Sequence, residues 1–192
     1  MVSRAPAVPL AETCRLNTCQ GSSFRQILAK RTREIYAVDK IVTTLWLCDP
    51  RTLPHHGGGK TALPGPLFDL AAFQELLRTG TLDLANDEHF YIATDDCWAN
   101  MKALKWTATG KLKQALLLLS PGEKKKGQGD YINSQWAQDS DGHWHRCDAY
   151  GICINEKDGF TRAKGAPETY IKFSIDEEDC VCLFLISCHP ST

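Results

Sequence analysis

A tyrosine and a lysine two residues apart, Tyr170 and Lys172, have the side chains best suited to gripping a phosphate group. They lie in the run 168–175, Glu-Thr-Tyr-Ile-Lys-Phe-Ser-Ile, where apolar and polar residues alternate. Alternation places both side chains on the polar face of a predicted strand, about 7 Å apart. That spacing lets a phenol and an ammonium converge on one phosphate, so this face is the first candidate site.

This strand is the first half of a predicted β-hairpin. Residues 176–179 form an acidic turn, and Cys180–Cys188 is apolar on both faces, as in a central, covered strand. Two further runs with a period of two, Tyr131–Ala137 and His143–Ile154, predict two more strands. The second half of the chain is therefore expected to form a sheet.

Three amphipathic segments before these strands predict helices. Asp69 caps the first and Gly80 ends it, Thr94 or Asp95 caps the second, and Lys111–Leu119 is the third. The positions expected to face the core are Leu70, Phe73, Leu76, Leu77, Cys97, Trp98, Met101, Leu104, Leu112, Ala115, Leu116 and Leu119. Helices followed by strands, without alternation, predict an α+β fold with two to three helices on an antiparallel sheet of about four strands.

The first 66 residues differ from the rest in composition. They hold six of the nine prolines, and the stretch 49–66 contains a Gly-Gly-Gly run typical of a linker. Residues 22–47 fit a helix followed by a short strand. We therefore divide the chain into an N-terminal extension with a linker, 1–66, and a domain over 67–192.

Charge and cysteine content narrow the class of protein. The net charge of −1 argues against a uniformly basic nucleic-acid binder, although lysines cluster locally at 111–113 and 124–126. The nine cysteines show no C-x2-C spacing, so we expect reduced structural thiols. No apolar run approaches the roughly 18 residues of a membrane span, and no secretory leader is evident. We expect a cytoplasmic protein.

Seven short segments, in their order and spacing, resemble the toxins of the MqsR family over about residues 67–190. They are Asp69–Gly80, Ala103–Trp106, Leu117–Pro121, Lys124–Gly127, Asp148–Tyr150, Tyr170–Phe173 and Leu185–His189. The resemblance implies a RelE-like fold and an endoribonuclease toxin that cleaves messenger RNA and inhibits growth. It also implies a cognate antitoxin as partner and no cofactor or membrane, and it leaves a ribosome partner open.

Metal-independent cleavage of RNA uses the substrate's own 2′-hydroxyl as nucleophile. The protein must then accept that proton, protonate the departing 5′-oxygen and stabilise the negative charge of the phosphorane. The matched positions imply Tyr170, Lys172 and Lys126, with Lys125 as an alternative to Lys126, as catalytic residues.

Two departures from the family pattern add histidines. The family's near-terminal lysine falls at about His189, where an imidazole can act as an acid while a lysine mainly supplies charge. The family's glutamine falls at His145 or Cys147, depending on where a gap is placed. His189 and His145 therefore join the catalytic candidates.

Basic and aromatic side chains supply candidate RNA contacts. Lys124 and Lys125 lie in the basic run, while Arg146 and Trp144 lie on the strand 143–154. An exposed tryptophan beside cations can stack on an unpaired base, although Trp144 is equally compatible with a place in the core. The basic run is equally typical of a solvated loop.

Two other classes of function stay open. The altered glutamine and lysine positions fit a non-catalytic module that only binds RNA or an antitoxin. The residues His143, His145, Cys147 and Cys153 could instead hold zinc, although their spacing is poor for a metal site.

Overall fold

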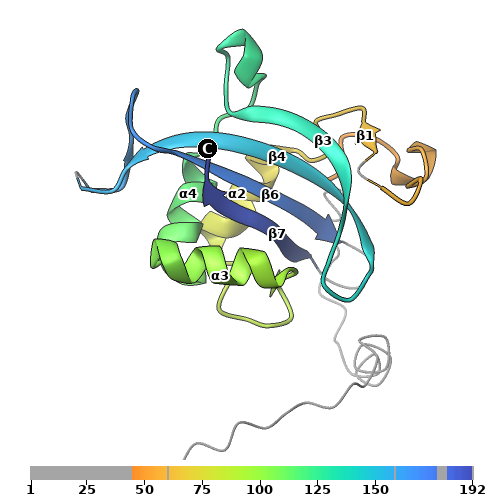
Figure 1. Cartoon of the computed structure of the whole chain (residues 1–192), viewed down its shortest axis with the longest axis horizontal. Helices are drawn as coiled ribbons and strands as arrows, with labels where there is room; N and C mark the ends of the chain where they lie inside the picture. Colours follow the sequence, from red (N-terminus) through yellow and green to blue (C-terminus); the bar gives the residue numbers. More distant parts are fainter. Residues whose placement is uncertain (1–44, 60, 158, 177–180, 192) are drawn as a thin grey trace, which may run out of the picture. The chain divides into compact units, whose positions relative to one another are not determined.

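The computed structural model describes residues 45–59, 61–157, 159–176 and 181–191. Of the helix and strand predicted over 22–47, only residues 45–47 are therefore described, and Trp46 forms an isolated bridge with Phe68 there. A seven-stranded mixed sheet forms the centre, in the order β1-β3-β4-β6-β7-β2, with β5 paired to β4 (Figure 1). Strand β2 runs parallel to β7, and the other pairs are antiparallel. The strands are β1 Ala62–Leu63, β2 Phe90–Ile92, β3 Tyr131–Gln138, β4 Trp144–Asn155, β5 Thr161–Arg162, β6 Glu168–Asp176 and β7 Cys182–Pro190.

The helices begin and end close to their predicted signals. They are α2 Leu70–Thr79, α3 Asp95–Leu104 and α4 Lys113–Leu118, with shorter turns η1 Pro50–Thr52, η2 Ala108–Leu112 and η3 Lys124–Lys126. The Asp69 carboxylate accepts from the amides of Ala71 and Ala72, and Gly80 ends α2 with a φ of 80°. The hydroxyl of Thr94 accepts from the Cys97 amide, so the predicted caps are confirmed.

Helices α2 and α4 lie against one face of the sheet, behind it in Figure 1, and the main core fills the space between. Ile171, Phe173 and Ile175 of β6 point into this core, as their alternation predicts. The Phe173 ring stacks between Phe73 of α2 and Tyr150 of β4, with centroids 5.1 and 5.6 Å away. We call this the helix face of the sheet and the opposite side the outer face.

Two expectations are wrong. Trp98 was expected in the core, but it is 51% exposed on α3, with the Lys102 ammonium 4.7 Å from its ring. The RelE-like fold, with helices on an antiparallel sheet of about four strands, is overturned by the seven-stranded mixed sheet. The four long strands match the predicted runs to within about two residues, but β1, β2 and β5 have only two or three residues each. Strands this short have no readable alternation.

Residues before position 67 also contribute to the folded unit. Leu45, Leu53 and Leu63 are buried in the main core, and β1 extends the sheet beside β3. The predicted division of the chain after Pro66 stays a prediction, because residues 1–44 lie outside the described residues. Among the described helices, none has the length and apolar character needed to cross a membrane.

A buried carboxylate on the helix face fixes the chain entering α2. Asp148 of β4 is fully buried and accepts hydrogen bonds from the amides of Leu67 and Phe68. The Ser134 hydroxyl donates to it as well. Burial raises the pKa of Asp148 to about 6, even though these donors act in the opposite direction. The carboxylate joins β3, β4 and the start of α2.

Candidate functional site

A row of side chains crosses the outer face where β6 begins and β7 ends. The strand register places Tyr170 opposite Gly151 of β4 on one side and His189 of β7 on the other. Lys172, two residues along β6, is opposite Ala149 and Ser187. Paired residues of adjacent strands point to the same face. Three of the five predicted catalytic residues, Tyr170, Lys172 and His189, therefore come together.

Tyr170 is the centre of this row. Its ring stacks on His189 with centroids 5.0 Å apart, and the Lys172 Nζ lies 5.6 Å from the Tyr170 ring centroid. Burial raises the pKa of Tyr170 to about 12, so the phenol keeps its proton near neutral pH. The Tyr170 phenol therefore has a proton that it can donate at neutral pH.

Lys172 is less accessible than its sequence position indicates. It lies on the outer face, away from the helices, but only 7% of the residue is exposed. A cation in a partly dehydrated setting interacts more strongly with an incoming anion than one fully in water. Lys172 therefore places a largely buried cation beside Tyr170.

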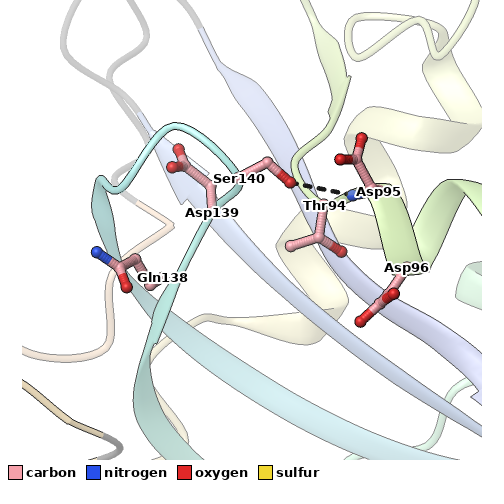
Figure 2. Close-up of a pocket in the computed structure, with 6 residues that line it drawn as sticks. All are labelled: Thr94, Asp95, Asp96, Gln138, Asp139 and Ser140. Carbon is pink, nitrogen blue, oxygen red and sulfur yellow. Dashed lines mark hydrogen bonds between the residues drawn. The ribbon is translucent and has the colours of Figure 1, made fainter.

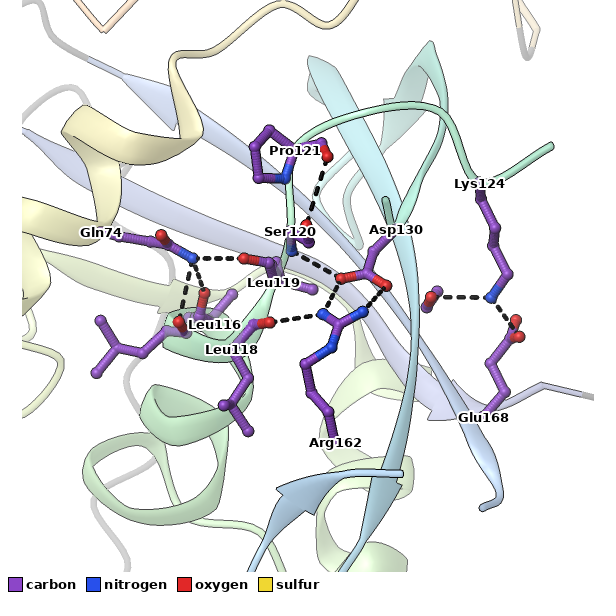
Figure 3. A network of polar contacts seen from close by, with 12 residues as sticks. Gln74, Leu116, Leu118, Leu119, Ser120, Pro121, Lys124, Asp130, Arg162 and Glu168 are labelled. Carbon is purple, nitrogen blue, oxygen red and sulfur yellow. Dashed lines mark hydrogen bonds and ion pairs between the residues drawn. The ribbon is translucent and has the colours of Figure 1, made fainter. Parts of the chain in front are cut away.

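Lys124 reaches the same row from the turn η3. Its Nζ donates to the carbonyl of Gly151 at 2.8 Å and forms an ion pair with Glu168 of β6 (Figure 3). A Cβ at position 151 would lie 2.7 Å from both the Lys124 Nζ and the Glu168 Oε1. The absence of a side chain at Gly151 thus makes room for the ion pair directly beside Tyr170.

Glu168 has the same strand parity as Tyr170 and Lys172, so its side chain also lies on the outer face. Its Oε1 accepts from the Ser191 hydroxyl at 2.9 Å. The hydrogen bond from Lys124 holds the pKa of Glu168 below its usual value. Glu168 is therefore a carboxylate at neutral pH, in contact with a cation.

A polar network braces the loop that carries Lys124 (Figure 3). Asp130 accepts from the guanidinium of Arg162 and from the Ser120 amide at 2.7 Å. The Gln74 side-chain amide donates to the carbonyls of Leu116 and Leu119 at 2.9 Å, which closes the end of α4. These contacts fix both ends of the segment 119–130, so η3 is held at a defined place above the sheet.

The other two lysines of η3 do not join the row in the same way. Lys126 forms an exposed ion pair with Glu123 at 2.8 Å, with 58% of its side chain in solvent. Lys125 is exposed on the same turn. The structure therefore brings Lys124, which the sequence assigned to RNA binding, into the position predicted for Lys126.

His145 shares the outer face but lies at the other end of β4. Six residues separate it from Gly151, or about 20 Å of strand. Its Nε2 lies 2.9 Å from the Asp139 Oδ2, and its ring stacks on Phe184 at 4.9 Å. Burial acts to raise the pKa of Asp139, but hydrogen bonds from His145 and the His143 amide hold it below its usual value.

The pocket beside this histidine is acidic. It is an open pocket of about 340 Å³ between the β3–β4 turn and the start of α3 (Figure 2). Its lining residues are Thr94, Asp95, Asp96, Gln138, Asp139 and Ser140. Three carboxylates repel a phosphate backbone, so this end of the sheet does not suit RNA.

Arg146 and Trp144 lie on the helix face, as their parity with Asp148 requires. The Arg146 guanidinium lies 4.7 Å over the Trp136 ring. His56 stacks on Trp144 with centroids 4.8 Å apart. The sheet itself separates both predicted RNA contacts from Tyr170.

Sequence reasoning missed Glu168 and Gly151. The parity of Glu168 with Tyr170 was a usable signal, because side chains two residues apart share a strand face. No local signal marks Gly151, since its place beside Tyr170 depends on the pairing of β4 with β6.

Within the part of the chain that the structure describes, no three Cys, His, Asp or Glu side chains are grouped to hold a metal ion. In comparisons with known proteins, no family model, curated protein or solved structure matches this chain.

Proposed function

We propose that this chain is an endoribonuclease toxin that cleaves messenger RNA by metal-independent attack of the substrate's 2′-hydroxyl. Its substrate places the activity in the cytoplasm, and its cognate antitoxin holds it inactive. The resemblance of short segments to MqsR-type toxins motivates the class of protein.

One observation carries the proposal: the strand register gathers Tyr170, Lys172 and His189 in one row on the outer face, and Lys124 reaches this row at Gly151. Two ammonium groups supply the positive charge that a pentavalent phosphorane needs. The phenol of Tyr170 supplies a proton for the departing 5′-oxygen. Such a row acts on a phosphodiester without a metal ion.

The test is cleavage of a fluorescently labelled, mixed-sequence single-stranded RNA by the purified full chain in EDTA. We expect fragments that end in a 2′,3′-cyclic phosphate. Tyr170→Phe should lower the rate about 100-fold, the usual contribution of a proton donor. Tyr91→Phe, at a partly exposed tyrosine of β2, is the matched control and should cleave like the wild type. Intact RNA after incubation with wild type would refute the proposal.

A non-catalytic RNA- or antitoxin-binding module is the second candidate. The observation that favours it is the low accessibility of both cations to a substrate. Lys124 is paired with Glu168, and Lys172 is only 7% exposed. This candidate predicts that labelled RNA, or the antitoxin, is retained by the wild type without any scission. A gel that resolves bound RNA from cut RNA separates the two functions.

A further inference from the structure

The proposed reaction still needs a group that takes the proton of the 2′-hydroxyl. Tyr170 holds its own proton, because burial raises the pKa of the phenol to about 12. Ammonium groups have no lone pair, so Lys124 and Lys172 cannot accept a proton in that state. Two neighbouring side chains, His189 and Glu168, have a lone pair that can take the proton. Glu168 is the one that contacts the Lys124 ammonium at Gly151, where a phosphate would bind.

Glu168 is a carboxylate beside this row. It shares the strand face of Tyr170 and Lys172, and its Oε1 lies 2.7 Å from the point where a Gly151 Cβ would stand. Gly151 is directly opposite Tyr170 in the register. A phosphate lying over Gly151 would meet the Glu168 carboxylate, the Lys124 ammonium and the Tyr170 phenol together.

We propose that Glu168 is the general base of this site and accepts the proton of the attacking 2′-hydroxyl. This inference rests on the proposed ribonuclease function and adds a catalytic residue to it. A carboxylate is an acceptor with several lone-pair sites, so its bond to Ser191 leaves room for the hydroxyl.

The step conserves atoms and charge. The 2′ O–H bond breaks and its proton passes to Glu168, while the 2′-oxygen forms a bond to phosphorus. The bond from phosphorus to the 5′-oxygen breaks, and that oxygen takes the proton of Tyr170. Return of the proton from Glu168 to Tyr170 through solvent restores the enzyme and leaves a 2′,3′-cyclic phosphate and a 5′-hydroxyl.

The ion pair with Lys124 couples binding to the strength of the base. In the free protein Lys124 lowers the pKa of Glu168 and makes the carboxylate a weak acceptor. A substrate phosphate draws the Lys124 ammonium toward itself, because it offers the same kind of charge-assisted hydrogen bond. The released carboxylate then binds protons more strongly, just where the 2′-hydroxyl arrives.

The groups around Glu168 come from three other elements. Lys124 contacts it from η3, Cys153 is its register partner on β4, and His189 lies on β7. Tyr170 and Lys172 follow it on β6. Lys124 is the only one of these that forms an ion pair with Glu168 in the described residues.

The test measures kcat and KM on the labelled RNA for wild type, Glu168→Gln, Glu168→Asp and Glu123→Gln. Glu123→Gln is the matched control. Glu123 also pairs with a lysine, Lys126, but this ion pair is exposed and lies on the turn that carries Lys124. We expect Glu168→Gln to lower kcat about 100-fold without raising KM. Glu168→Asp keeps a carboxylate and should retain part of the activity. The fall of kcat at acid pH should vanish in Glu168→Gln.

The outcomes separate this inference from the function on which it rests. A wild type that cuts no RNA overturns both. A wild type that cuts RNA, with Glu168→Gln equally fast and with the same pH profile, overturns the base alone. Should Glu168→Gln melt below the assay temperature, Glu168→Asp and the wild-type pH profile decide. A wild-type kcat that stays level as the pH falls through the ordinary range of glutamate contradicts the proposal.

Discussion

Two carboxylates on opposite faces of one sheet are held in contrasting ways. Asp148 lies on the helix face, fully buried, and accepts from the amides of Leu67 and Phe68 and from a serine hydroxyl. Glu168 lies on the outer face, partly exposed, and its main partner is the Lys124 ammonium. Burial raises the pKa of Asp148, while the cation lowers the pKa of Glu168.

The contrast separates a residue that holds the fold from one that can do chemistry. The donors around Asp148 are two backbone amides and the Ser134 hydroxyl, and the carboxylate is fully buried, so no anion from solvent reaches these donors. The donor at Glu168 is the flexible end of a lysine, which an anion can draw away. Substitutions at Asp148 should therefore change stability, and those around Glu168 should change activity.

The largest expected effect is the loss of the buried carboxylate. Asp148→Ala should lower the free energy of unfolding by about 3–5 kcal/mol, because each buried donor left without an acceptor costs about 1–3 kcal/mol. Glu168→Ala is the matched comparison and should cost less than about 1 kcal/mol. Urea denaturation monitored by tryptophan fluorescence measures both values. If both variants lost the same free energy of unfolding, Asp148 would not be the more important of the two carboxylates for stability.

The next effect concerns the fixed cation of the row. Lys172→Met keeps the aliphatic stem and removes the charge, so we expect RNA cleavage to fall about 10²–10³-fold with little change in melting temperature. Lys125→Met, on the exposed turn η3, is the control and should stay within about fivefold of wild type. If the two variants lose activity equally, position in the row is irrelevant and the cations act only through net charge.

The pH dependence of stability tests Asp148 directly. Its pKa is about 6 in the folded chain against 3.8 for an ordinary aspartate, so the native state binds more protons between these values. Wild type should therefore lose about 2 kcal/mol relative to Asp148→Asn as the pH rises from 4 to 7. Denaturation of both proteins across this range measures the difference. A constant difference would mean that the carboxylate is charged throughout.

The smallest effect tests the fit around Gly151. Gly151→Ala places a Cβ about where the Lys124 Nζ and the Glu168 Oε1 meet, and both atoms are the ends of flexible side chains. We expect cleavage to fall about tenfold through misplacement of the pair, with a small loss of stability. Gly159→Ala meets no atom within 4 Å but needs a positive φ, so it serves as a folding control. Unchanged kcat in Gly151→Ala would show that the pair is not needed in this place.

Local signals in the sequence predicted the helices well. Asp69, Thr94 and Gly80 act on amides and carbonyls within a few residues, so their effect does not depend on the rest of the fold. The sheet was harder to predict, because β2 joins β7 across about ninety residues of chain through three paired positions. A contact of that kind depends on tertiary packing and leaves no pattern in a three-residue strand.

The residues of the candidate site also fall into two groups, those that local alternation predicts and those that strand pairing places. Alternation within β6 placed Tyr170 and Lys172 on one face, as the structure has them. Alternation within β4 could not say whether His145 or Arg146 shares that face, nor how far along the sheet each one lies. The strand register settles both points. His145 lies on the outer face beside Asp139, and Arg146 lies on the helix face.

By itself, the sequence determined which segments form strands, which form helices and which side chains of β6 share a face. Backbone geometry repeats over two residues in a strand and about four in a helix, so these features are local. Only the tertiary structure decided that Gly151 and His189 lie beside Tyr170, because hydrogen bonds between strands far apart in the chain set that register. The tertiary structure also decided that Lys124 reaches Gly151 from the turn η3.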